Sequence, residues 1–213
     1  MTSKRECILA FFGCFSPPTN GHINAMACAY DHMKNQNYDV QSVIIIPASG
    51  GYESRKPGLI DAKYRLTMCR MIAEEYDFIG VNSVEADKTE WTRTIDTLQY
   101  LSDQYPNTRI FLVCGIDTVD AFETQWREPD IIRILNEFGL IVFPRCGVHI
   151  TNIESHCKYL IGRTENVYVV ESNPLSEVSS SLVRERLSNK NHISGLVLKS
   201  IEEYIYQNHL YDT

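Results

Sequence analysis

The chain has 213 residues, of which 44% are hydrophobic and 22% charged, as in ordinary folded proteins and unlike disordered ones. This length suits one moderately large domain, so we expect residues 1–213 to form a single domain with a buried core. The net charge of −7 argues against a general nucleic-acid-binding surface. An anionic ligand would therefore have to be held by local basic groups and backbone N–H donors.

Cysteine usage and the length of the apolar runs bear on the location of the protein. The seven cysteines are scattered, with no C-x-x-C pair, which favours free thiols in a reducing compartment and argues against a metal site. The longest apolar runs have the length of a strand, and residues 1–6 lead directly into the first. We therefore expect no signal peptide, membrane span or membrane partner. The sequence predicts an intracellular protein, cytoplasmic or nuclear, and leaves a homo-oligomer open.

Strand-like and helix-like segments alternate along the chain without an internal repeat. Uninterrupted apolar runs predict buried strands over residues 7–12, 40–47, 78–84, 109–115, 140–144 and 167–171. Helices are predicted over residues 21–35, 61–76, 91–105, 119–122, 128–138, 153–160, 179–187 and 195–208. This order predicts an α/β fold, a Rossmann-like doubly wound parallel sheet with residues 179–213 as a carboxyl-terminal helical segment. Ligands of such sheets bind beyond the carboxyl ends of the strands, where we expect the loops to form one cleft.

The segment from Gly13 to His22, GCFSPPTNGH, follows the first predicted strand and has the features of a phosphate-handling loop. Gly13 lets the backbone approach a ligand, and Asn20 can cap the following helix. The N–H groups and the positive dipole at the start of that helix favour an anion. His22 can donate to a phosphate oxygen and stabilise transition-state charge. The alternative is that His22 serves only to cap its own helix.

A second motif, Ser179-Ser180-Ser181 followed by Arg184, places three hydroxyls at a helix start and an arginine one turn inside. Hydroxyls and backbone N–H groups can hold phosphate oxygens, and a guanidinium offers a planar fork to a polyphosphate. By itself the motif fits a simple serine cap as well as it fits a phosphate site.

Together, G-x-F-x-P-x-T-x-x-H and S-S-S-x-x-R form the paired signature of the nucleotidyltransferase α/β-phosphodiesterase superfamily. The chain resembles the eukaryotic-type nicotinamide mononucleotide adenylyltransferases of that superfamily. The resemblance extends to Gly58-Leu59-Ile60 with Arg65, Glu90-Trp91 with Thr94, Cys114-Gly115-Ile116-Asp117, Trp126, Gly139-Leu140-Ile141 with Arg145, and Glu203-Tyr204-Ile205 with Asn208, Leu210 and Tyr211. It implies a HIGH-type nucleotidyltransferase fold over nearly the whole chain. It also implies transfer of the adenylyl group of ATP to nicotinamide mononucleotide, and to nicotinate mononucleotide as well, with Mg²⁺ bound to ATP.

The resemblance implies a role for each residue of the site. The catalytic candidates are His22, Arg184 and Thr19, although many superfamily members have histidine where Thr19 stands and a turn role for it stays open. The residues implied for ATP are Gly13, Phe15, His22, Gly115, Asp117, Ser180, Ser181 and Arg184. The residues implied for the mononucleotide are Cys14, Lys56, Trp91, Thr94, Trp126 and Arg145.

Three of the mononucleotide assignments have alternatives, and a fourth, Cys14, departs from the family's pattern. Trp91 and Trp126 are suited to stacking on a cationic pyridine ring, but large aromatic residues more often serve in packing. Arg55 could replace Lys56 at the phosphate if the loop shifts by one residue. Cys14 replaces the serine usual in this loop, which keeps the backbone N–H and removes the hydroxyl.

Two rival functions fit the same motifs. One is a related nucleotidyltransferase with a different phosphorylated acceptor, such as phosphopantetheine. The other is a non-catalytic nucleotide-binding or chaperone-like protein that keeps the cleft. A dinucleotide-binding dehydrogenase is disfavoured, because no G-x-G-x-x-G follows the first strand.

Overall fold

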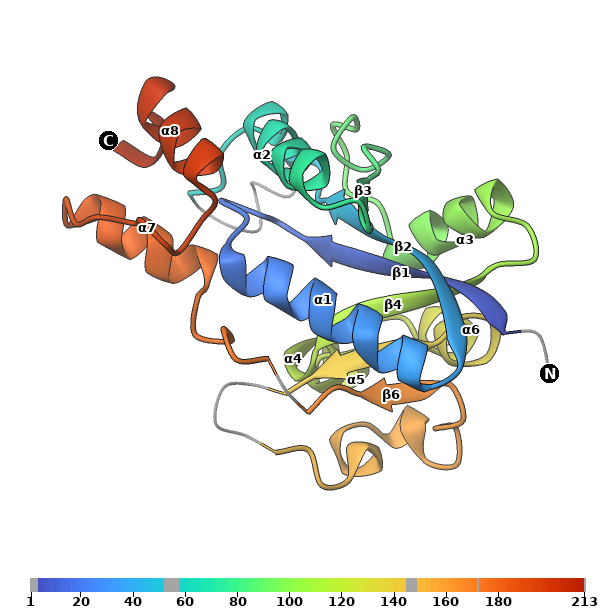
Figure 1. The fold of residues 1–213 in the computed structure, drawn as a ribbon. Helices are drawn as coiled ribbons and strands as arrows, with labels where there is room; N and C mark the ends of the chain where they lie inside the picture. The colour runs from blue at the N-terminus through green and yellow to red at the C-terminus, as the bar shows by residue number, and fades with distance from the viewer. Residues whose placement is uncertain (1–3, 52–57, 145–148, 172, 213) are drawn as a thin grey trace. The chain divides into compact units, whose positions relative to one another are not determined.

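The computed structural model describes residues 4–51, 58–144, 149–171 and 173–212, and they contain one six-stranded sheet in the order β3-β2-β1-β4-β5-β6 (Figure 1). The strands are β1 (Arg5–Gly13), β2 (Tyr38–Pro47), β3 (Ile79–Val81), β4 (Arg109–Gly115), β5 (Leu140–Phe143) and β6 (Val167–Val169). The helices are α1 (Asn20–Asn35), α2 (Ala62–Glu75), α3 (Thr94–Gln104), α4 (Ile116–Asp120), α5 (Phe122–Gln125), α6 (Glu128–Glu137), α7 (Ser180–Ser188) and α8 (Lys199–Gln207). Strands β1, β4, β5 and β6 pair in parallel. The predicted Rossmann-like α/β fold with carboxyl-terminal helices is confirmed.

The chain folds into two compact units, each made of three separated stretches. Unit one consists of Met1–Phe11, Ala27–Val43 and Arg93–Asn173, and unit two of Phe12–Met26, Ile44–Thr92 and Pro174–Thr213. Three of the five boundaries along the chain fall inside an element, namely β1, α1 and β2. That residues 1–213 act as one domain stays a prediction.

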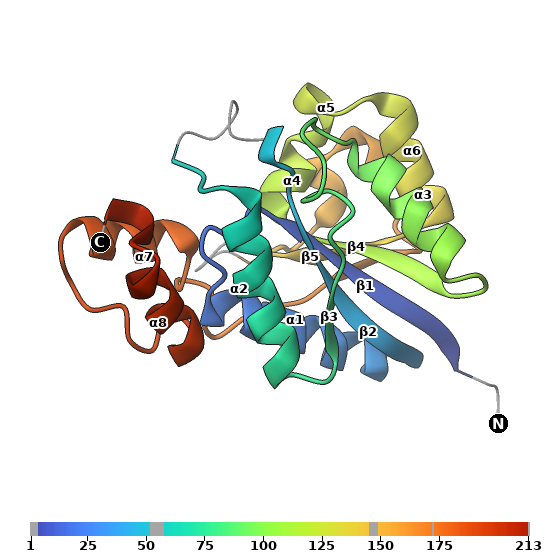
Figure 2. The same cartoon turned by 90° about the horizontal axis from the view of Figure 1, so that it is seen from above.

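Unit one is built on the apolar strands β4 and β5. Register pairs Leu112 with Leu140 and Gly115 with Phe143, so the two strands end at the same edge, and α4 starts directly after β4. A Cβ on Gly139 would lie 2.5 Å from a ring carbon of Phe111 and 2.8 Å from the carbonyl oxygen of Asn166, so only glycine fits before β5. Helices α3 and α6 lie side by side in this unit (Figure 2).

Unit two contains α2, β3, α7 and α8. Asp61 caps α2, since its side chain accepts from the Lys63 N–H at 3.0 Å. Helix α2 lies beside α8 (Figure 2), where the rings of Tyr64 and Tyr204 are 6.4 Å apart. The Ala48 N–H donates to the carbonyl oxygen of Gly13 at 2.9 Å. The loops that follow β1 and β2 therefore start as neighbours in this unit.

Several predicted elements differ from the structure. The strand predicted over residues 78–84 is shorter, Ile79–Val81, and the helix predicted over residues 119–122 is instead the pair α4 and α5, on either side of Ala121. Residues 153–160 form two short 3₁₀ turns, Ile153–His156 and Lys158–Leu160, because Cys157 between them is extended (φ −158°, ψ 127°). Helix α3 begins at Thr94, so Trp91 precedes it. Helix α8 begins at Lys199, because Gly195 has φ +80° and Leu198 is extended at the cap. Within the described ranges, no helix combines the length and apolarity needed to cross a membrane.

Candidate functional site

In unit two the two sequence motifs contact each other directly. Ser180 Oγ donates to the carbonyl oxygen of Pro17 at 2.7 Å, and Thr19 Oγ1 donates to the carbonyl oxygen of Val178 at 2.9 Å. A Cβ on Gly21 would lie 2.1 Å from the same Val178 oxygen. The glycine at this position is therefore required for the close approach of α1 to the segment before α7.

His22 lies in the first turn of α1 and is held through its Nδ1 atom. The backbone N–H of Thr19 donates to Nδ1 at 3.0 Å, and Thr19 Oγ1 lies 2.8 Å from the same nitrogen. Because Nδ1 accepts, the proton of the neutral ring is on Nε2. His22 is half-buried, whereas Thr19 is only 1% exposed. This geometry makes His22 a hydrogen-bond donor through Nε2 and Thr19 the group that orients it.

The start of α1 offers fewer free donors than the sequence suggested. The Asn20 N–H donates to the carbonyl oxygen of Leu196 at 2.8 Å, and the His22 N–H donates to that of Thr19 at 3.0 Å. Asn20 does not cap the helix, because it is the first helical residue and its Nδ2 donates to the carbonyl oxygen of Gly195 at 2.9 Å. Side chains must therefore supply most of the contacts to an anion here.

Phe15 fills the turn between Gly13 and His22. It is 2% exposed and has φ 48°, in the left-handed region that non-glycine residues avoid. Its ring is edge-on to the His22 ring, with centroids 5.3 Å apart. A Cβ on Gly13 would lie 3.0 Å from the Phe15 ring. Glycine at position 13 thus makes room for this ring, a packing role beside the predicted approach to a ligand.

Each serine of the second motif has its own partner. Ser179 caps α7 by accepting from the Leu182 N–H at 3.2 Å, and Ser180 binds the first loop as described above. Ser181 is exposed, and its Oγ accepts from Arg184 Nη2 at 3.2 Å. Arg184 Nη1 donates to the carbonyl oxygen of Ser16 at 2.7 Å. The guanidinium of Arg184 is therefore fixed by both motifs.

Arg65 connects the loops after β1 and β2 from within the core of unit two. It is fully buried, with 0% of its surface exposed. Its Nη1 donates to the carbonyl oxygen of Cys14 at 2.9 Å, and its Nη2 to that of Ala48 at 2.7 Å. Its Nε donates to the carbonyl oxygen of Ile60 at 2.9 Å. A buried guanidinium that donates to several backbone carbonyl oxygens holds the chain segments that carry those oxygens in fixed positions.

The remaining candidates in unit two are Cys14 and Trp91. Cys14 is half-buried, and Trp91 is 47% exposed in the segment before α3. Lys56, its alternative Arg55, and Arg145 lie outside the described residues.

Unit one contains the other candidates. Gly115 and Asp117 lie at the start of α4, and both are exposed. Gly115 has φ −78°, and a Cβ there would meet nothing within 4 Å. Thr94 is the first residue of α3, and Trp126, at the end of α5, packs edge-on against Phe122 with centroids 5.1 Å apart. In the part of the chain that is described, no three His, Cys, Asp or Glu side chains gather as a metal ion would require.

The sequence reasoning missed Arg65 and Ser16 as parts of the site. A signal for Arg65 was available, because it falls at helical spacing among the apolar residues Ala62, Leu66, Cys69 and Ile72, which are buried in α2. An arginine on such a face needs buried acceptors. Ser16 acts partly through its carbonyl oxygen, a group that every residue has, so its type carried no signal.

Known proteins resemble this chain over nearly its whole length. A model of the family described as cytidylyltransferase-like matches residues 10–186. Nicotinamide/nicotinic acid mononucleotide adenylyltransferase 2 of Caenorhabditis elegans is 31% identical over 221 residues, covering 98% of each chain. The enzyme of the same family from Arabidopsis thaliana is 27% identical, covering 99% of this chain and 92% of its own. A solved structure of the Plasmodium falciparum nicotinic acid mononucleotide adenylyltransferase matches in fold, with a TM-score of 0.73 at 21% identity over 97% of this chain and 98% of its own.

Proposed function

We propose that this chain, which belongs to the nicotinamide/nicotinic acid mononucleotide adenylyltransferases within the cytidylyltransferase-like family, transfers the adenylyl group of ATP to nicotinamide mononucleotide. It also accepts nicotinate mononucleotide. The products are NAD or deamido-NAD, together with pyrophosphate. The observation that carries the proposal is the direct contact between the two motifs, which fixes His22 and Arg184 next to one loop.

The reaction is an in-line displacement at phosphorus. A phosphate oxygen of the mononucleotide forms a bond to the α-phosphorus of ATP, while the bond from that phosphorus to the bridging oxygen breaks and pyrophosphate leaves. The protein forms no covalent intermediate, so its contribution is orientation and stabilisation of charge. Mg²⁺ enters as part of the substrate, bound to the triphosphate oxygens.

His22 and Arg184 stabilise the negative charge that spreads over the phosphate oxygens. The Nε2–H of His22 donates a hydrogen bond, and its opposite ring nitrogen is already held by Thr19, so the ring need not reorient during the reaction. Arg184 supplies a permanent positive charge. Thr19 acts by orienting His22, since it is buried and its hydroxyl donates to Val178. Ser180 also acts indirectly, because its hydroxyl donates to the carbonyl oxygen of Pro17 and holds the first loop in place.

The mononucleotide is bound by Cys14 through its backbone N–H, and by Lys56, Trp91, Thr94, Trp126 and Arg145. Trp91 is suited to this role because a large apolar ring exposed to solvent has an affinity for a flat ligand. Gly115 and Asp117 bind the ATP ribose. In support of this, Gly115 has neither a positive φ nor a neighbour within 4 Å of an added Cβ, so nothing inside the protein requires glycine at this position. We further propose an intracellular location, which the six described free cysteines suit.

Parallel assays test the function. Purified protein with ATP and Mg²⁺ is given each mononucleotide in turn, and dinucleotide and pyrophosphate are measured. We expect both dinucleotides, and we expect His22→Ala to lower kcat by about 100-fold or more with an unchanged unfolding transition. A fully active, folded His22→Ala variant would overturn the assignment of His22. Product from phosphopantetheine alone would favour a different acceptor, and ATP binding without pyrophosphate release would favour the non-catalytic alternative.

A further inference from the structure

Phe15 needs support from its neighbours. Its positive φ of 48° costs a non-glycine residue free energy. Such a conformation persists only when the surrounding structure holds it. Because the Phe15 ring lies edge-on to His22, whatever holds this turn also sets the surroundings of the proposed transition-state donor.

On one side of Phe15, the backbone is held by Arg65. The guanidinium donates to the carbonyl oxygen of Cys14 at 2.9 Å, and three further donor contacts anchor it to Ile60, Ala48 and Ser49. Because these three acceptors all lie between β2 and α2, the position of the Cys14 carbonyl is fixed relative to the loop after β2.

On the other side of Phe15, the chain is held from its carboxyl terminus. Tyr211 OH lies 3.1 Å from Ser16 Oγ, at hydrogen-bond distance across 195 residues of sequence. Burial raises the pKa of Tyr211, while the nearby positive charges of Arg184 and Arg65 act in the opposite direction. The phenol therefore stays protonated and within electrostatic range of both guanidinium groups. Tyr211 itself has φ 62°, in the turn that follows α8.

We infer that Arg65 and Tyr211 are positioning residues that hold the first loop on both sides of Phe15, and that the carboxyl-terminal turn is thereby part of the ATP site. Tyr211 acts through Ser16, whose carbonyl oxygen accepts from Arg184 at 2.7 Å. Arg65 acts through Cys14. The inference rests on the proposed function, because its kinetic consequence is measured in that reaction.

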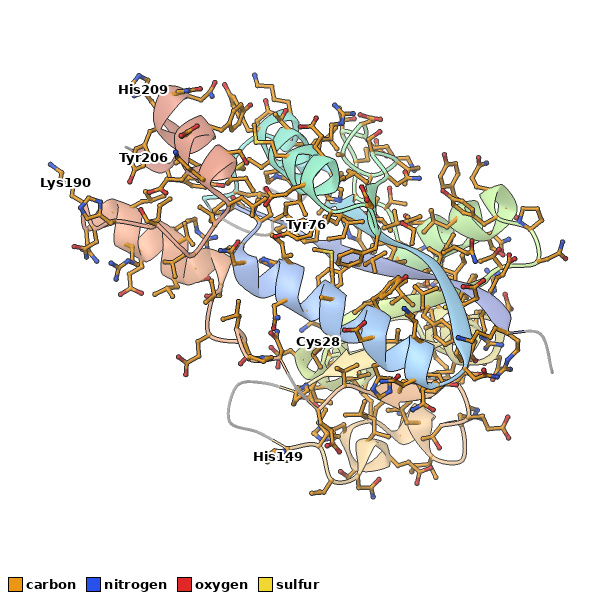
Figure 3. The ribbon with its side chains drawn as sticks, viewed as in Figure 1. Cys28, Tyr76, His149, Lys190, Tyr206 and His209 are labelled. Atoms are coloured by element: carbon orange, nitrogen blue, oxygen red, sulfur yellow. The ribbon has the colours of Figure 1, made fainter. Side chains whose placement is uncertain are left out.

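The first test removes one hydroxyl. Tyr211→Phe keeps the ring, and Tyr206→Phe is its matched control, since Tyr206 is an exposed tyrosine of α8 (Figure 3). We expect Tyr211→Phe to lower kcat by about 3- to 10-fold, the loss of one hydrogen bond, with a smaller change in KM for the mononucleotide. Tyr206→Phe should retain wild-type kinetics. Equal kinetics for Tyr211→Phe and wild type would overturn the role of Tyr211.

Ser16→Ala separates positioning from general stability. If Tyr211 acts through the Ser16 hydroxyl, Ser16→Ala and Tyr211→Phe should lower kcat equally, and the double variant should be no slower than either single one. Multiplied effects in the double variant would show that Tyr211 acts elsewhere and would overturn this step.

The second test concerns Arg65. Arg65→Lys keeps the charge but loses the fork of donors, and Arg70→Lys is its control on the exposed side of α2. We expect Arg65→Lys to lower kcat by about 10-fold or more and Arg70→Lys to leave kcat unchanged. Equal effects of the two variants would overturn the role of Arg65.

A spectroscopic readout tests the inference without the reaction. Each of the six histidines gives one Cε1–H signal in NMR, and His22→Gln identifies that of His22. Because the Phe15 ring lies against it, this signal should shift in Arg65→Lys and Tyr211→Phe and stay in place in both controls. Wild-type protein inactive with both mononucleotides would defeat the proposed function, whereas an unmoved His22 signal would defeat the positioning inference.

Discussion

Replacing Gly21 by alanine tests the interlock between the two motifs. The added Cβ would lie 2.1 Å from the carbonyl oxygen of Val178 and 2.7 Å from that of Leu175. Non-bonded heavy atoms prefer a separation of about 3.5 Å, so the backbone must move by about 1.4 Å to relieve the contact with Val178. Both obstacles are main-chain atoms and cannot rotate away as a side chain would.

The cost of Gly21→Ala follows from this forced movement. Overpacking of this kind costs about 1–3 kcal/mol, which lowers Tm by about 2–12 °C for a chain of this size. The same movement weakens the hydrogen bond from Thr19 to the Val178 oxygen. Because Thr19 orients His22, the displacement should lower kcat by about 10-fold or more. Thermal unfolding followed by circular dichroism, together with initial rates, measures both. A variant with wild-type Tm and kcat would refute the interlock.

The remaining predictions concern single positions. Gly115→Ala should keep Tm within about 2 °C of the wild-type value, because nothing lies within 4 Å of the new Cβ. The same variant should raise KM for ATP, and unchanged kinetics would count against a contact between ATP and the backbone of Gly115. Thr19→Val should lower kcat by about 3- to 10-fold, since it removes the hydroxyl beside His22, and a wild-type rate would show that the backbone N–H suffices. Burial lowers the pKa of His32 against a smaller opposing effect of Glu171, so the unfolded chain binds the proton more readily and stability is lost as pH falls below about 6.5. His32→Gln should therefore reduce the drop in Tm between about pH 7.5 and about pH 5.5, and an unchanged drop would contradict this.

The fold was largely predictable because its main signals are local. Strand β4 has the predicted bounds, since its apolar run is sharply ended by a glycine. Asp61 marks the start of α2 for the equally local reason that its side chain satisfies an N–H two residues later. Residues 153–160 were mispredicted because helical spacing of apolar residues does not reveal the extended backbone of Cys157.

The sequence names residues for the candidate site, and these assignments stay predictions, but it does not reveal the contacts that the residues make. His22 and Arg184 belong to a recognisable pattern, but the burial of Thr19 and its bond to Val178 depend on a segment about 160 residues away. Ser179, Ser180 and Ser181 look equivalent in sequence, whereas their three hydroxyls cap a helix, fasten a loop and contact a guanidinium, respectively. Such tasks depend on tertiary contacts, which spacing along the chain does not encode.

The contacts of the site have a common logic. A displacement at phosphorus without a covalent intermediate requires hydrogen-bond donors and charges in fixed positions. Donor groups are held best by acceptors that neither move nor titrate. Backbone carbonyl oxygens meet both conditions. Four side chains of the site donate to such oxygens: Arg184 to that of Ser16, Ser180 to that of Pro17, Thr19 to that of Val178 and Arg65 to that of Cys14. Substitution of the donors should therefore impair catalysis more than substitution of the side chains that merely carry the accepting carbonyls, such as that of Val178.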